Sequence, residues 1–184
     1  MANVKGTNVI QVVRTLRKNR ASALANLPPK LHRYLDERVL PSSWYPERDQ
    51  LALLGALAAI APAPDAWHFF GRVSAQTDLT GVYRALLKAN QPLATLQNTA
   101  VLWRNFHDTG EMTAKPHGDT TATIALKDYA IVSADLCRLM TGYAFEAANM
   151  SGGADVKVDE IECRARGQSQ CVWRVTWKHS ARPQ

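Results

Sequence analysis

Apolar residues recur at helical spacing through the first 108 residues of the chain. From Thr7 onward they predict a short amphipathic helix, which Thr7 or Asn8 can cap. Pro46 stands at the first position of a later helix, where a missing N–H costs nothing. The helices predicted after the first one cover residues 31–39, 46–60, 66–76 and 92–109.

The pattern changes after Gly110, where short threonine-rich stretches flank Gly118-Asp119 and predict a β-hairpin. The elements predicted from here on are strands at 111–117 and 120–126, a helix at 128–149, and strands at 155–165 and 171–178. In the last strand alternate residues point to one face: Cys171, Trp173, Val175 and Trp177.

These elements predict an α+β fold. N-terminal helices pack on a four-stranded antiparallel sheet, and the C-terminal half has the order β-β-α-β-β. The 184 residues suffice for one well-filled core. We therefore expect a single domain over 1–184, with a mainly helical part at 1–108 and the β-β-α-β-β part at 109–184.

The composition is that of an ordinary globular domain, with 46% hydrophobic and 21% charged residues. The net charge is +6, and much of the excess lies early in the chain. The basic residues concerned are Arg14, Arg17, Lys18, Arg20, Lys30 and Arg33. Because they are dispersed at helical spacing, we interpret them as a solvated face rather than a nucleic-acid site.

The sequence shows no membrane-targeting segment. Its first residues lack the apolar core of a signal peptide, and no later apolar run approaches the roughly 18 residues of a membrane span. We therefore expect a cytoplasmic protein. Thiols stay reduced in that compartment, so clustered cysteines favour metal binding or redox chemistry over structural disulfides.

All three cysteines lie between Cys137 and Cys171, and Glu160 stands three residues before Cys163. Zinc is commonly held by four such ligands in a tetrahedron, and a site with four protein ligands is closed to substrate. The pattern therefore predicts a structural zinc site at Cys137, Glu160, Cys163 and Cys171. Ordinary buried cysteines account for the same residues, because free cysteine is among the most buried side chains.

The spacing of these residues sets a geometric condition. Glu160 and Cys163 are an odd number of residues apart, so on a straight strand they would lie on opposite faces. The strand must therefore bend or bulge there, or Cys163 must belong to the following turn. A loop containing Gly167 can return Cys171 beside Cys163, and Cys137 must come from the start of the preceding helix.

The stretch from Cys137 to Cys171 resembles the 4-vinyl reductase superfamily of small-ligand-binding domains. The resemblance rests on the cysteines, on Gly-Tyr-Ala at 142–144 and on the run at 160–167. The same fold group includes sensor domains of phenol-responsive bacterial activators and, more distantly, haem nitric-oxide-binding domains and transport-particle subunits. In the phenol sensors zinc is held by a helix-borne cysteine and a Glu-x-x-Cys-x7-Cys hairpin. This implies Cys137, Glu160, Cys163 and Cys171 as ligands here.

The N-terminal half is similar to an uncharacterised family of myxobacterial proteins with this fold, through Leu-Pro-Pro at 27–29 and Trp-Tyr-Pro at 44–46. The resemblance implies an apolar pocket for a small hydrophobic or aromatic molecule. Because the chain leaves no room for an output domain, we expect it to signal through a protein partner, as a dimer. The pocket residues we expect are Trp103, Phe106, His107 and Tyr143. Core packing is the alternative for the three aromatic residues.

Three alternative functions remain. The first is a haem-based gas sensor with His107 as the proximal haem ligand, although no Cys-x-x-Cys-His attachment motif is present. The second is a reductase or other enzyme, which the name of the superfamily suggests. Against an enzyme, the sequence has neither a Gly-rich nucleotide loop nor the His-x-Glu and Cys-x-x-Cys pair of a zinc deaminase. We therefore expect no catalysis. A structural adaptor related to transport-particle subunits would need no pocket.

Overall fold

The computed structural model describes residues 2–60 and 63–179. It confirms the α+β class, with seven α-helices and a four-stranded antiparallel sheet in the described residues. The chain forms two compact units: an N-terminal unit of residues up to 66 with 104–109, and a C-terminal unit of 67–103 with residues from 110 on. Helix α5 (Ala66–Thr80) and most of α6 (Pro92–Phe106) belong to the C-terminal unit. No helix within the described ranges is long and apolar enough to cross a membrane.

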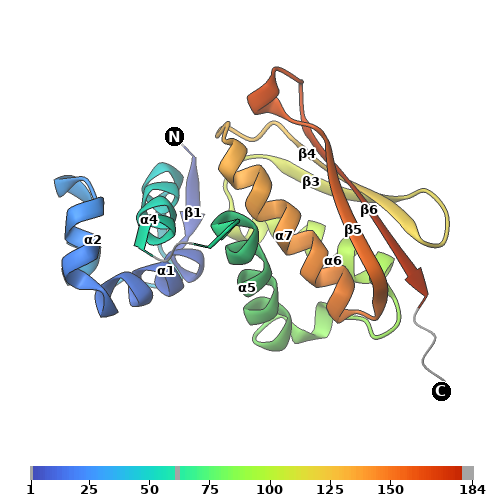
Figure 1. The fold of residues 1–184 in the computed structure, drawn as a ribbon, viewed down its shortest axis with the longest axis horizontal. Helices are drawn as coiled ribbons and strands as arrows, with labels where there is room; N and C mark the ends of the chain where they lie inside the picture. Colours follow the sequence, from blue (N-terminus) through green and yellow to red (C-terminus); the bar gives the residue numbers. More distant parts are fainter. Residues whose placement is uncertain (1, 61–62, 180–184) are drawn as a thin grey trace. The chain divides into compact units, whose positions relative to one another are not determined.

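The N-terminal unit is mainly helical. Its elements are β1 (Asn3–Lys5), α1 (Gly6–Lys18), α2 (Arg20–Asn26), the 3-10 turn η1 (Pro29–Leu31), α3 (Arg33–Asp36), β2 (Trp44–Pro46) and α4 (Glu47–Ile60). Figure 1 labels α1, α2, α4 and β1. Helix α1 packs on α4 through the predicted stripe of buried residues, Val9, Val12, Val13 and Leu16.

Two local predictions for this unit were wrong. Helix α1 begins at Gly6 without a side-chain cap, so neither Thr7 nor Asn8 caps it. A Cβ at Gly6 would lie 2.0 Å from the carbonyl oxygen of Leu40, so the chain starts this helix in close contact with another segment. Pro46 ends β2, which pairs with β1. That pairing, which local periodicity does not reveal, moves the start of α4 to the next residue.

The C-terminal unit contains the sheet. Its elements are α5 (Ala66–Thr80), η2 (Arg84–Leu86), α6 (Pro92–Phe106), β3 (Glu111–Pro116), β4 (Thr121–Lys127), α7 (Ala134–Met150), β5 (Gly153–Glu162), η3 (Arg164–Arg166) and β6 (Cys171–His179). The first residue of α5 and the last three of α6 belong to the N-terminal unit. Both predicted hairpins and the β-β-α-β-β order are confirmed.

The strand order is β3-β4-β6-β5, and every pair is antiparallel. Along β6, Trp173 and Val175 on the predicted face are buried. On the other face Arg174 is exposed, whereas Val172 is buried as well. Helix α7 packs on β5 and β6, and Figure 1 shows it lying along β5 with α5 on its other side. Helix α7 begins at Ala134 rather than 128, because the Ser133 side chain caps it by accepting a hydrogen bond from the Leu136 N–H.

Candidate metal centre

Three separate elements bring the cysteines together. Cys137 lies in the first turns of α7, Cys163 directly follows β5, and Cys171 opens β6. All three are buried. The Sγ of Cys137 lies 3.4 Å from that of Cys171 and 3.6 Å from that of Cys163. All three sulfurs lie within 4.8 Å of one another.

These distances suit a shared metal ion. Sulfurs bound tetrahedrally to zinc at about 2.3 Å would lie about 3.8 Å apart. A disulfide would need about 2.0 Å, and the three cysteines are free thiols. The structure therefore brings the three predicted cysteines together. Metal binding itself stays a prediction.

A β-bulge solves the problem of the odd spacing between Glu160 and Cys163. The pairing of β5 with β6 shifts register between Glu160 and Glu162, and Cys163 then precedes the η3 turn. Gly167 ends that turn with φ +90°, a conformation that favours glycine. The strand therefore bulges and Cys163 also leaves it, the two solutions that the sequence allowed.

The η3 turn directs polar groups at the sulfurs. The backbone N–H of Arg164 donates to the Cys171 Sγ at 3.5 Å. The Gln168 side chain accepts a hydrogen bond from the Cys163 N–H at 3.0 Å, which holds the turn closed. Burial raises the pKa of Cys163, and a backbone hydrogen bond from Ala165 opposes that rise. Such N–H donors stabilise thiolates and are suited to a metal-binding turn.

Burial nevertheless opposes ionisation of the thiols. It raises the pKa of Cys137 well above the usual range, and the neighbouring Glu160 carboxylate and Cys171 thiol raise it further. Burial also raises the pKa of Cys163, again with Glu160 as the next cause. A cation bound by Cys137 and Cys163 would therefore have to displace their protons.

Glu160 lies at the edge of this cluster. It faces Trp173 across the β5–β6 pair. Its Oε2 accepts a hydrogen bond from the Arg166 guanidinium at 2.8 Å, whereas its Oε1 is buried without a hydrogen-bond partner in the described chain. Glu160 is not among the ligand atoms that all lie within 4.8 Å of one another. A cation bound at the cluster would satisfy this buried oxygen, which otherwise faces only the Cys137 and Cys163 thiols.

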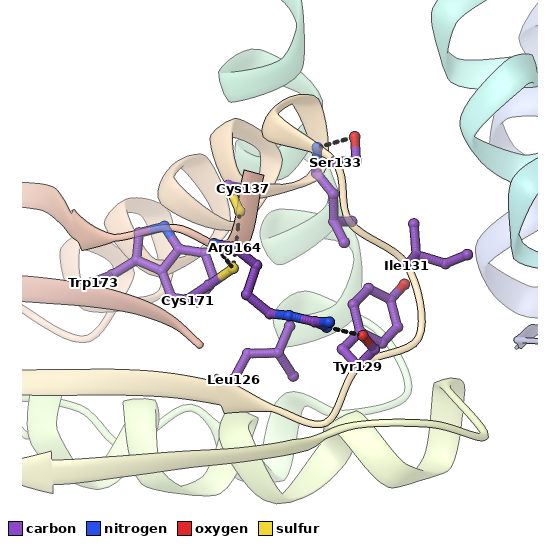
Figure 2. A pocket seen from close by; sticks show the side chains of 9 residues that line it. Leu126, Tyr129, Ile131, Ser133, Cys137, Arg164, Cys171 and Trp173 are labelled. Carbon is purple, nitrogen blue, oxygen red and sulfur yellow. Dashed lines mark hydrogen bonds between the residues drawn. The ribbon is translucent and has the colours of Figure 1, made fainter. Parts of the chain in front are cut away.

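A small cavity of about 10 Å³ lies beside the cysteines, enough for about one water molecule. Its walls, drawn in Figure 2, are Leu126, Tyr129, Ile131, Ser133, Leu136, Cys137, Arg164, Cys171 and Trp173. Figure 2 also shows the Arg164 side chain reaching across it to donate to the Tyr129 carbonyl oxygen.

The four expected pocket residues do not line this cavity. Trp103 is buried in the C-terminal unit, in edge-on contact with Tyr129 at 5.0 Å between ring centroids. Tyr143 donates a hydrogen bond from its hydroxyl to Asp78 at 3.2 Å. Their role as ligand contacts stays a prediction.

Phe106 and His107 belong to the N-terminal unit. Phe106 is buried, and the His107 Nδ1 lies 2.6 Å from an oxygen of the fully buried Glu47. The His107 backbone also bridges Val4. The residues that sequence reasoning missed are Tyr129 and Arg164. Neither carries a sequence signal, because their positions depend on how two loops meet.

Comparisons with known structures place the fold. One similar structure is an oxygen-binding H-NOX domain related to soluble guanylate cyclases, with a TM-score of 0.67, 13% identity and 98% of both chains covered. Another is a T. tengcongensis H-NOX mutant, with a TM-score of 0.67, 14% identity, and 97% of this chain and 100% of that one covered. A third is an S. oneidensis H-NOX protein in the Fe(II)NO state, with a TM-score of 0.67, 12% identity, and 95% and 99% covered.

This chain therefore has the H-NOX fold, the haem nitric-oxide-binding fold that the sequence resemblance implied. No protein-family model matches the sequence, and neither does any curated protein. The similarity concerns the fold, because the identities are 12–14%.

Proposed function

We propose that this chain is a small-molecule-binding, sensor-type domain whose C-terminal unit is anchored by structural zinc. The proposal of a metal site is supported by the cluster of three buried sulfurs, two pairs of which lie 3.4 and 3.6 Å apart. The binding role is supported by the H-NOX fold over nearly the whole chain.

Cys137, Cys163 and Cys171 would hold the ion as thiolates, and Glu160 is the fourth ligand we propose. Its Oε1 is the buried oxygen without a hydrogen-bond partner in the described chain. When bound, the ion supplies a crosslink between α7 and the β5–β6 hairpin and removes the cost of that unpaired oxygen. Zinc is favoured over harder cations because the donor set is rich in sulfur.

The ligand we propose is a small hydrophobic or aromatic molecule, and the role is non-catalytic. A metal with four protein ligands has no position for a substrate. Output would pass through a protein partner or a second copy of the chain.

One observation favours a second candidate, a structural adaptor without a ligand. The cavity beside the cysteines holds about 10 Å³, whereas pockets for drug-sized molecules measure about 300–1,000 Å³. It is therefore too small for an aromatic molecule.

We do not propose a haem. His107 is fixed by its contact with buried Glu47 and by its backbone bridge to Val4. These contacts account for it as a structural residue of the N-terminal unit.

Native mass spectrometry with metal analysis on the protein purified from cells tests the proposal. We expect one zinc per chain and an additional organic mass. Cys163→Ser should lose the zinc, while Glu160→Gln should weaken binding less because a neutral oxygen can still coordinate. Asp159→Asn is the control, since this neighbouring residue is exposed. Zinc without an organic mass would favour the adaptor. Full zinc in Cys163→Ser would refute the ligand assignment.

A further inference from the structure

The two carboxylate oxygens of Glu160 have different surroundings. Its Oε2 accepts a hydrogen bond from the Arg166 Nη1 at 2.8 Å. Its Oε1 is buried and faces only the Cys137 and Cys163 thiols. One oxygen is therefore held by a cation of the protein itself, and the other is left for the cysteine cluster.

Arg166 contacts Glu160 at two points. In addition to the contact with Oε2, its Nη2 donates to the main-chain carbonyl oxygen of Glu160 at 3.4 Å. The η3 turn, which lies between β5 and β6, brings the arginine back beside Glu160. Because the guanidinium is a planar fork with fixed donor directions, a contact at two points fixes the orientation of the carboxylate.

The exposure of this pair indicates that its role is local. The Arg166 side chain is 51% exposed and that of Glu160 is 17% exposed. Ion pairs with an exposed member contribute little to the stability of a fold. Removing Arg166 should therefore change how Glu160 meets an ion rather than how the chain unfolds. The guanidinium also offsets part of the excess negative charge of three thiolates and a carboxylate around a divalent cation.

We propose that Arg166 is a positioning residue that restricts Glu160 to one donor oxygen and thereby favours zinc relative to larger thiophilic cations such as Cd²⁺. The inference rests on the zinc site proposed above. Zinc binds four ligands in a tetrahedron and needs only one carboxylate oxygen. Larger divalent cations accept more ligands and can take both oxygens of a carboxylate. With Oε2 held by Arg166, such a cation loses a ligand that zinc does not use.

The test measures the affinities of the full chain for Zn²⁺ and for Cd²⁺ by competition with a chelator. In Arg166→Gln the Oε2 atom is free to reach the ion. The ratio of the zinc affinity to the cadmium affinity should therefore fall by about tenfold, the order expected for one additional polar contact. Arg174→Gln is the matched control, because it removes an exposed arginine from β6 in the same unit and should leave the ratio unchanged.

Two further readouts test the positioning role itself. Cadmium NMR reports the number of oxygen ligands of bound Cd²⁺, so the resonance of Arg166→Gln should lie upfield of the wild-type resonance. In a Glu160→Gln background the same arginine change should leave the affinity ratio unaltered, because a glutamine side chain has only one oxygen to offer.

The outcomes separate this inference from the zinc proposal. Failure of the wild-type chain to bind either ion would overturn the metal site. Binding of both ions with the same affinity ratio in wild type and Arg166→Gln would overturn only the role of Arg166. So would an unchanged cadmium resonance, or an effect of equal size in the Glu160→Gln background.

Discussion

Asp78 shows how a single residue can couple stability to pH. Burial raises the pKa of its carboxyl to about 6, and the hydrogen bond from the Tyr143 hydroxyl opposes that shift. The folded state therefore holds the proton more tightly than the unfolded chain. The contribution of Asp78 to stability is complete below about pH 4 and is lost as the pH rises through about 6.

We therefore expect Asp78→Asn to stabilise the protein at pH 8 by on the order of 1–2 kcal/mol, after allowing for its partial exposure. The amide oxygen still accepts from Tyr143, and no charge is buried. The gain should shrink toward zero at pH 4. Urea unfolding at both pH values measures it, with Asp119→Asn in an exposed turn as the control. A variant less stable than wild type at pH 8 would show that the ionised carboxylate is favourable.

Glu146 is a second buried carboxylate, but its oxygens are satisfied. Arg72 donates to one at 2.7 Å and Gln76 to the other at 2.8 Å. All three residues lie in the packed pair of helices α5 and α7. The sequence places Glu146 in a predicted helix but does not indicate that it is buried. Its two partners, Gln76 and Arg72, lie 70 and 74 positions earlier in the chain, so no local pattern reveals them.

At the scale of elements, two glycines allow α5 and α7 to cross closely. A Cβ at Gly71 would lie 1.9 Å from the carbonyl oxygen of Leu139. A Cβ at Gly142 would lie 2.0 Å from that of His68. Real side chains do not approach backbone this closely, so any substitution must separate the helices.

Gly71→Ala and Gly142→Ala should each destabilise the protein by about 1–3 kcal/mol through overpacking. Gly55→Ala is the matched control, since nothing lies within 4 Å of its Cβ position in α4. That change should stabilise by roughly 0.5–1 kcal/mol through helix propensity. Chemical denaturation of the three variants checks the contrast. Equal effects at all three positions would contradict a close helix crossing.

Element boundaries show where local patterns succeed and where they fail. The β5 bulge was one of the solutions that the odd spacing of Glu160 and Cys163 allowed for a shared site, because strand geometry alternates strictly. The start of α4 was placed one residue early, since Pro46 joins a two-stranded pair with a distant segment. The start of α7 was placed at 128 because apolar residues continue before the Ser133 cap.

At the scale of the whole molecule, the cysteine cluster connects elements that are distant in sequence. Cys137 and Cys171 are separated by 34 positions, yet their sulfurs lie 3.4 Å apart. A metal at this point would stabilise the C-terminal unit by binding its folded state only.

Removing the metal with a chelator should therefore increase hydrogen exchange in α7, β5 and β6. The amides of α1 and α4 should keep their protection, since these helices lie in the other compact unit. Hydrogen-exchange mass spectrometry measures both sets at once. Cys163→Ser is the control, because a protein without the site should not respond to the chelator. An equal response in both units, or in that variant, would contradict a local metal crosslink.

The sequence by itself determined the β-β-α-β-β order of the C-terminal half, both of its hairpins and the cysteine set. These depend on period, turn residues and spacing, which are local properties. Only the tertiary structure decided the rest: the α5–α7 crossing, the β1–β2 pair, the position of Glu160 at the cluster's edge, and the cavity closed by Arg164 and Tyr129. Each arises where distant segments meet, and their contacts are selected by packing and by the need to pair buried polar groups.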